Sequence, residues 1–301
     1  MQTAYLIYAI LTFVCSLLGG IVISKLKFSH TGLQILLSFV GGLMLAVAIL
    51  HLLPHSVTEL KGNTKTASVA MLAGILITFL LLRVFQVHQH GAYDDTQSQI
   101  CQHPEHRQAT ASDDPNHCEV HRSRYSWIGL FIGLGIHAII DGLAISAIVV
   151  ESTNHTEVPL LPGIALAAAI LLHKPLDSMS VISVMKSSGW DQNAVRLANF
   201  SFALISPLGI YIAAYGFDVF AVDSNTSLLG WTFGISAGCF ITIALSDILP
   251  ELTFHNHDRL KLTIALILGV ALGFMLQASE TTHDHTHHHP TAITELSTSG
   301  T

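Results

Sequence analysis

The chain has 301 residues, of which 50% are hydrophobic and only 11% are charged, and its formal net charge is −7. A soluble domain carries about 25% charged residues, so this composition excludes a soluble enzyme and a disordered protein and predicts a multi-span membrane protein. No basic block indicates binding to nucleic acid. The chain also contains 19 His, nearly as many as its 20 acidic residues, and any function has to account for them.

Eight segments are apolar enough to cross a membrane, because a span needs about 20 mostly apolar residues. Each is expected to be an α-helix, since hydrocarbon cannot satisfy open backbone groups. The first is interpreted as a retained span and not as a signal peptide, because no Lys- or Arg-rich region precedes it. The predicted spans are residues 5–23, 32–54, 67–87, 126–150, 160–185, 194–217, 228–249 and 260–277.

The basic residues predict the orientation of these spans. With both termini on the non-cytoplasmic side, ten of the 13 Lys and Arg fall in cytoplasmic segments, two fall outside and Lys174 lies within a span. This distribution agrees with the positive-inside rule. The sequons at Asn154 and Asn225 then lie outside, which suits a glycosylated protein of the plasma membrane or an endomembrane.

Two distant segments, in spans 2 and 7, resemble each other at an offset of 196 residues. The alignment of residues 42–55 with residues 238–251 pairs two glycines, two prolines, and His51 with Asp247. If spans 1–3 repeat as spans 6–8, an odd number of spans per unit gives the units opposite orientations, which is typical of transporters. The alternative is that two apolar helices share a proline-terminated end by chance.

This pattern predicts a 3+2+3 inverted-repeat architecture of eight transmembrane helices. The expected division is a first repeat (1–87), a cytoplasmic His-rich loop (88–125), two central spans (126–185), an inverted second repeat (194–278) and a His-rich tail (279–301).

The loop is too polar and turn-rich to form a core and is expected to be disordered. His-rich tracts indicate loose metal binding, although a solvated linker would explain them as well. The candidate auxiliary ligands are His88, His90, His103, His106, His117 and His121 in the loop, and His283, His285, His287, His288 and His289 in the tail.

The two central spans carry ionisable residues in a repeated pattern. His137 and Asp141 are four residues apart, as are His173 and Asp177, and this spacing places each imidazole and carboxylate on one helix face. Ionisable groups deep in a span are costly and are functional candidates. Two facing helices would offer Zn²⁺ two nitrogens and two oxygens in a tetrahedral set, and Fe²⁺ and Mn²⁺ also tolerate mixed ligands.

Lys174 lies beside this face, because it follows His173 by one residue. An ammonium at this depth requires a carboxylate or an aqueous cavity. One interpretation is a simple ion pair with Asp177, three residues further on. The other is that the lysine cation occupies a place where a second metal ion would otherwise bind.

The motifs taken together resemble those of the ZIP (Zrt-/Irt-like) family of divalent-metal transporters. They are His51-Leu-Leu-Pro54 in span 2, His137-Ala-Ile-Ile-Asp141-Gly142 in span 4, His173-Lys-Pro-Leu-Asp177 in span 5, Ser206-Pro-Leu-Gly209 in span 6, and Ser246-Asp247-Ile-Leu-Pro250-Glu251 in span 7. The resemblance implies eight spans with both ends outside. It also implies that His137, Asp141, His173 and Asp177 bind the transported metal.

Three departures from the family pattern remove ligands of a second metal. They are Ala138, Lys174 and Ser206, and they imply a one-metal site, nearest the subgroup that has a His-Lys motif in span 5. The family also implies an elevator-like movement of spans 1, 4, 5 and 6 past spans 2, 3, 7 and 8, often in a homodimer. His51 and Asp247 either lie along the metal pathway or cap span ends.

The function predicted from these observations is transport of Zn²⁺ toward the cytoplasm, with Fe²⁺, Mn²⁺ and Cd²⁺ as related substrates, and no enzymatic activity. A cation-diffusion-type exporter is the first alternative, but it requires six spans and a folded C-terminal domain. An intramembrane zinc hydrolase is the second, and it requires a third histidine in the cluster, for which His51 is the candidate.

Overall fold

The computed structural model describes residues 2–25, 30–85, 126–152, 161–219, 225–254 and 259–284. Eight helical segments in these residues are long and apolar enough to cross a membrane, which confirms the predicted all-α membrane protein. The loop 88–125 and residues 285–301 lie outside the described residues. The helices are α1 (Gln2–Lys25), α2 (His30–Val47), α3 (Leu53–Glu59), α4 (Thr64–Phe85), α5 (Ser126–Ser152), α6 (Ile164–Ser187), α7 (Gln192–Val219), α8 (Asn225–Phe254) and α9 (Arg259–Asp284).

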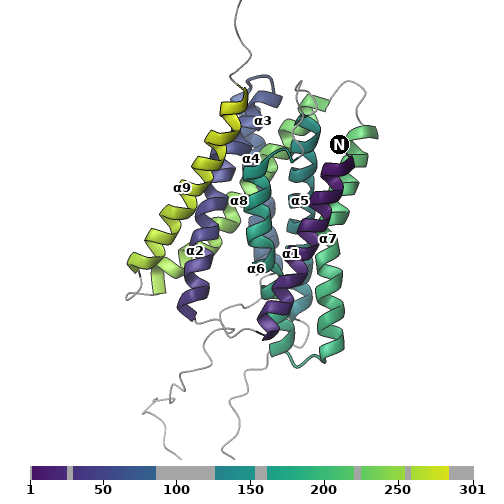
Figure 1. Cartoon of the computed structure of the whole chain (residues 1–301), viewed down its shortest axis with the longest axis vertical. Helices are drawn as coiled ribbons and strands as arrows, with labels where there is room; N and C mark the ends of the chain where they lie inside the picture. The colour runs from purple at the N-terminus through teal and green to yellow at the C-terminus, as the bar shows by residue number, and fades with distance from the viewer. Residues whose placement is uncertain are drawn as a thin grey trace, which may run out of the picture.

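The helices run side by side in one bundle, with α2 and α9 along one side and α1 and α7 along the other (Figure 1). Burial separates central from peripheral helices: 67% of the apolar stretch of α6 is buried, against 22% in α4 and α9. Helix α6, which carries His173 and Asp177, therefore lies at the centre of the bundle.

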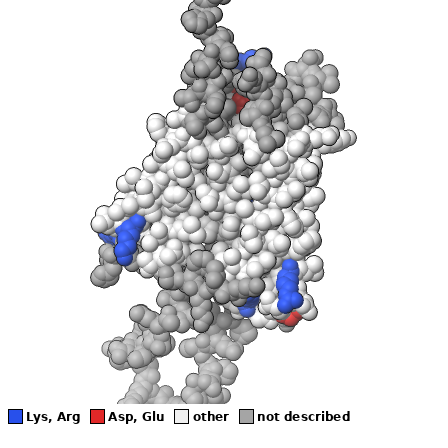
Figure 2. Space-filling view, in the orientation of Figure 1, with Lys and Arg blue, Asp and Glu red and all other residues white. Residues whose placement is uncertain are grey.

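The surface of the bundle is apolar between its two ends. On the face shown in Figure 2, Lys, Arg, Asp and Glu side chains lie only toward the ends, and a broad band between them is free of these residues. Large apolar side chains on the peripheral helices are exposed, among them Leu76, Leu80, Ile267 and Phe274. This distribution is expected where the surrounding medium is lipid.

Span 2 continues past its expected end at Pro54. A single π-helical turn, Ala48–Leu52, joins α2 to α3, and the Leu53 N–H donates to the Ala48 carbonyl. Proline is tolerated in the first turn of a helix because its missing N–H has no partner there, and Pro54 occupies that position in α3. The proline therefore restarts the helix, which runs on to Glu59.

Close backbone contacts at two glycines follow the offset of the predicted repeat. A Cβ at Gly42 would lie 2.3 Å from the Leu266 carbonyl oxygen, and one at Gly238, its counterpart 196 residues on, would lie 2.1 Å from the Met71 carbonyl oxygen. The first contact joins α2 to α9 and the second joins α8 to α4. The close packing of α2 on α9 thus has a counterpart in the close packing of α8 on α4.

A second set of close contacts joins α1, α5, α6 and α7. A Cβ at Gly19 would lie 2.2 Å from the Pro175 carbonyl oxygen, which brings the backbone of α1 against α6. A Cβ at Gly142 would lie 2.7 Å from the Ser206 carbonyl oxygen, which brings α5 against α7. Small residues let the backbones of membrane helices approach closely, so these contacts hold α1 against α6 and α5 against α7.

Alanine at Gly238 is expected to destabilise the bundle by about 1–3 kcal/mol, because the added methyl group has to displace the backbone of α4. Thermal unfolding of the purified protein in detergent measures the effect. Gly216→Ala is the matched control, since nothing lies within 4 Å of the Cβ that would be added there. Equal unfolding temperatures for the two variants would contradict the close packing of α8 on α4.

Candidate metal centre

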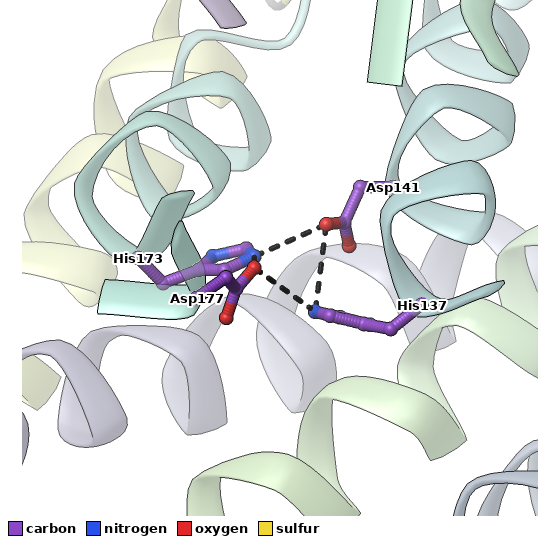
Figure 3. Close-up of side chains that lie close together, drawn as sticks. All are labelled: His137, Asp141, His173 and Asp177. Carbon is purple, nitrogen blue, oxygen red and sulfur yellow. Dashed lines mark hydrogen bonds and ion pairs between the residues drawn. The ribbon is translucent and has the colours of Figure 1, made fainter. Parts of the chain in front are cut away.

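The two predicted His/Asp pairs meet in the middle of the bundle. His137 and Asp141 project from α5, and His173 and Asp177 project from α6 toward them (Figure 3). One ligand atom from each of the four residues lies within 4.8 Å of all the others. All four residues are buried, so the cluster is shielded from water and lipid.

The spacing of the donor atoms fits a single small cation. Asp141 Oδ2 lies 3.4 Å from His137 Nε2 and 3.2 Å from His173 Nε2, and Asp177 Oδ2 lies 3.9 Å and 3.8 Å from the same two nitrogens. Two ligands about 2.0–2.2 Å from a tetrahedral Zn²⁺ are themselves about 3.3–3.6 Å apart. A small contraction of the cluster would therefore complete a two-nitrogen, two-oxygen shell.

The tautomer of His173 is fixed by its own helix. Its Nδ1–H donates to the Ala169 carbonyl oxygen at 2.8 Å, and a carbonyl can only accept. In the neutral ring, Nε2 therefore carries the lone pair and faces Asp141 Oδ2, which is also an acceptor. A cation between these two acceptors, which lie 3.2 Å apart, would be bound by both, and a backbone carbonyl behind the imidazole is a common partner of a metal-binding histidine.

Other polar atoms of the cluster are buried without a hydrogen-bond partner among the described residues. They include both ring nitrogens of His137, Oδ1 of Asp141 and Oδ2 of Asp177. Buried polar groups are normally satisfied, and a cation bound at the centre of the cluster would satisfy His137 Nε2 and Asp177 Oδ2 together. Phe240 closes one side, with its ring centroid 6.4 Å from that of His137 and 5.7 Å from that of His173.

Lys174 contacts both carboxylates of the cluster. It is fully buried; its Nζ donates a hydrogen bond to Asp141 Oδ2 and lies 3.6 Å from Asp177 Oδ2. The sequence predicts only Asp177, three residues further along α6, as an ion-pair partner. The structure shows Asp141 on α5 as a further partner. The ammonium group of Lys174 therefore contacts Asp141 Oδ2, the oxygen that also faces both imidazoles.

Hydrogen bonds between helices hold the turn of α6 that carries the cluster. Ser178 Oγ donates to Asn199 Oδ1 at 2.7 Å, and Asn199 Nδ2 donates to the Leu17 carbonyl at 3.0 Å, which ties α6 to α7 and α1. Ser206 Oγ donates to the Ala138 carbonyl at 3.1 Å and ties α7 to α5 beside His137. Ser206, one of the three departures from the family pattern, thus helps to hold α5 in place beside His137.

A pocket between α4, α5 and α8 reaches the cluster at His137. It lies where α4 ends and α5 begins, and it is lined mainly by aliphatic side chains, among them Leu81, Leu82, Leu130 and Leu134. His137 is the one ionisable side chain that lines it.

The other candidate residues lie apart from this cluster. His51 is buried in the π-helical turn, where its Nδ1 contacts Gln277 Oε1 at 2.7 Å. Asp247 belongs to α8, and His283 to α9, but their side chains lie outside the described residues. Ten further candidate histidines lie wholly outside the described residues: His88, His90, His103, His106, His117, His121, His285, His287, His288 and His289.

A contact between His55 and Glu151 was not predicted from the sequence. His55 Nδ1 lies 2.6 Å from Glu151 Oε1, and the two residues are 96 positions apart on α3 and α5. The position of His55 four residues after His51 is the same spacing that identified the central pairs. The same four-residue spacing, applied to two histidines, would have identified His51 and His55 as candidates.

The family model described as ZIP Zinc transporter matches residues 3–279. Zinc transporter ZIP9-B of Xenopus laevis is 30% identical over 189 residues, which cover 58% of this chain and 58% of that relative, less than two thirds of its length. Zinc transporter ZIP9-A of Xenopus laevis is 23% identical over 316 aligned positions, covering 89% of this chain and 93% of the relative. Zinc transporter ZIP1 of Danio rerio is 23% identical, with coverage of 88% and 92%.

These relatives are named as transporters and not as enzymes, in agreement with the expectation from the sequence. The family model extends over nearly all of the eight helices, and the buried His/Asp cluster lies within the matched region. The chain therefore belongs to the ZIP zinc transporter family.

Proposed function

We propose that the protein transports Zn²⁺, or a related divalent metal ion, across the membrane through a single-metal site formed by His137, Asp141, His173 and Asp177. The buried four-residue cluster carries this proposal, since its donor atoms converge at the spacing of one small cation. Nitrogen and carboxylate ligands suit Zn²⁺ and also Fe²⁺ and Mn²⁺. The names of the relatives favour zinc.

Lys174 is the reason for proposing one metal ion and not two. Its Nζ lies against both carboxylates, so its positive charge would repel a second cation that shared them. The bound metal ion would share these carboxylates with the positive charge of Lys174. We therefore expect weaker metal binding than at a site that has carboxylates and no lysine.

The proposed direction is toward the cytoplasm, with both termini on the opposite side. The excess of Lys and Arg in the segments that join α1 to α2, α4 to α5, α6 to α7 and α8 to α9 supports this orientation. The pocket that reaches His137 is lined by residues near the end of α4 and the beginning of α5. In this orientation the pocket lies in the cytoplasmic half and would serve as the exit.

The proposed movement carries α1, α5, α6 and α7 as one body past α2, α3, α4, α8 and α9. The glycine contacts support it, since Gly19 and Gly142 join helices of the first group, whereas Gly42 and Gly238 join helices of the second. Contacts that bury backbone against backbone resist sliding, so each group is expected to move as a unit.

Uptake of labelled metal ions into proteoliposomes tests the function. We expect Zn²⁺ to accumulate with wild-type protein and not with Asp177→Ala, and competition by Cd²⁺, Mn²⁺ and Fe²⁺ to rank the other substrates. Loading the vesicles and following efflux distinguishes import from the exporter alternative. Equal flux for wild-type protein and protein-free vesicles would reject transport. The hydrolase alternative is disfavoured because His51, its required third histidine, lies outside the cluster.

Uptake is also expected to fall as the pH drops from about 7 toward about 5. Metal binding requires unprotonated imidazoles, so protons compete with Zn²⁺ at His137 and His173. Initial rates at a fixed Zn²⁺ concentration, with the pH equal on both sides of the vesicle, measure the effect. A rate that stays constant down to about pH 5 would contradict the assignment of the histidines as ligands.

A further inference from the structure

A hydrogen bond at the end of α5 joins this helix to α3. His55 Nδ1 lies 2.6 Å from Glu151 Oε1, and because a carboxylate oxygen accepts, the imidazole N–H donates. Glu151 is only 6% exposed, and its Oε2 has no hydrogen-bond partner among the described residues. The hydrogen bond from His55 therefore compensates this carboxylate for its burial, and hydrogen bonds to charged groups are among the stronger ones.

The neighbouring helix contacts divide the bundle into two groups. We call α1, α5, α6 and α7 the first group, and α2, α3, α4, α8 and α9 the second group. In the first group, Tyr8 Oη donates to the Pro162 carbonyl at 2.6 Å, which fixes α1 to the residues that precede α6. In the second group, Ser56 Oγ donates to the Gly230 carbonyl at 2.7 Å, which fixes α3 to α8. Each of these hydrogen bonds, like the glycine contacts described above, lies within one group.

The hydrogen bond between His55 and Glu151 crosses from one group to the other. His55 belongs to the second group, where its ring packs against that of Phe233 on α8, with centroids 5.6 Å apart. Glu151 belongs to the first group, on the same helix as Asp141 and about 15 Å further along it. A side-chain hydrogen bond is lost beyond about 3.5 Å, so a displacement of α5 past α3 by about 3 Å breaks this one.

The pocket and this hydrogen bond lie toward opposite ends of α5. Leu130 and Leu134, which line the pocket, are near the beginning of the helix, whereas Glu151 is next to its last residue. The pocket lies between the two groups, because it is lined by α5 from the first and by α4 and α8 from the second. The two groups are therefore bonded together at one end of α5 and leave a pocket between them at the other.

We propose that the hydrogen bond between His55 and Glu151 is a latch that stabilises this conformation and has to break before the first group moves past the second. The latch rests on the proposed transport function and its movement, and it acts on the equilibrium between conformations without binding metal. Loss of the latch is expected to raise the population of the alternative conformation, relative to this one, by about 10- to 100-fold.

Distances between spin labels measure this population without transport. Thr3 of α1 and Thr58 of α3 are exposed, belong to different groups and lie at the same end of the bundle (Figure 1). Thr3→Cys and Thr58→Cys carry the labels in full-length protein whose four native cysteines are replaced by alanine, in nanodiscs and in chelator. We expect one main distance when the latch is intact and a second distance in Glu151→Ala. An unchanged distribution of distances would overturn the latch.

His55→Phe is a second variant that removes the same hydrogen bond. It keeps an aromatic ring against Phe233 and leaves Glu151 in place. Because both variants break one contact, we expect the same second distance from each, and no further increase when they are combined. Tyr8→Phe is the matched control, since it removes a hydrogen bond of the same length, 2.6 Å, within the first group. An equal second distance from Tyr8→Phe would indicate general loosening and would overturn the latch.

A cleavable cross-link tests whether the latch opens during zinc uptake. When His55→Cys and Glu151→Cys are joined by a thiol cross-linker, we expect uptake to stop, and to return when a reducing agent cleaves the link. The control joins Trp127→Cys to Trp190→Cys, whose rings are 5.5 Å apart within the first group, and is expected to retain uptake. Full uptake while positions 55 and 151 are joined would overturn the latch. Absence of uptake by wild-type protein would reject the transport function alone, and the spin-label distances would still decide the latch.

Discussion

Replacing His173 by alanine is expected to reduce zinc uptake into proteoliposomes to the level of protein-free vesicles. The variant removes one of two imidazoles and leaves the two carboxylates and His137 around an incomplete shell. Altering a residue that hydrogen-bonds a metal ligand lowers the affinity for the metal by about 10- to 100-fold. Loss of the ligand itself is expected to lower the affinity by more than the upper end of that range. Asp141→Ala is expected to have the same effect.

Ser180→Ala is the matched control for this prediction. Ser180 lies on α6 two turns from His173, is exposed, and its hydroxyl donates only to the Leu176 carbonyl of its own helix. We expect normal uptake from this variant. Normal uptake from both His173→Ala and Asp141→Ala, at wild-type protein levels in the vesicles, would reject the central cluster as the transport site.

Replacing Lys174 by methionine is expected to strengthen zinc binding and to destabilise the empty protein. Repulsion between an ammonium group and a dication about 5 Å away is several kcal/mol at the dielectric constant typical of proteins. We therefore expect the half-saturating Zn²⁺ concentration to fall by at least about tenfold. The maximal rate is expected to fall as well, because a more tightly held ion leaves more slowly.

The stability of the same variant gives an independent measurement. Asp141 and Asp177 lose their buried cation, and breaking a buried ion pair costs about 3–5 kcal/mol. We expect a lower unfolding temperature in chelator and recovery in excess Zn²⁺, because the bound ion replaces the lysine charge. Lys186→Met, the same change at the end of α6, is the control and is expected to alter neither quantity. An unchanged affinity would contradict the position of Lys174 beside the ion.

The central cluster was predictable from the sequence because each of its His/Asp pairs lies within a single helix. An i, i+4 spacing places His137 with Asp141, and His173 with Asp177, on one face whatever the rest of the fold. Likewise, each span is recognisable from its own length and polarity. The contact of Lys174 with Asp141 depends on how α5 and α6 pack, and no pattern within either helix specifies that distance.

The contacts of His51 and His55 show the same limit more clearly. The partner of His51 is Gln277, 226 residues away, and the partner of His55 is 96 residues away. Neither glutamine nor glutamate at a span end is unusual, so each would be interpreted from sequence as a polar cap. The π turn was not predicted either, because Pro54 indicated the end of span 2, whereas in the structure Pro54 lies in the first turn of α3.

The position of Lys174 has a consequence for the response to membrane voltage. Two carboxylates and one ammonium give the empty site a net charge of −1, and Zn²⁺ changes it to +1. In the proposed movement, the loaded site carries a positive charge inward and the empty site carries a negative charge outward. An inside-negative potential drives both steps, by about 2.3 kcal/mol per charge for each 100 mV. Without the lysine, the loaded step would be electrically silent and the return of the empty site would carry the whole voltage dependence.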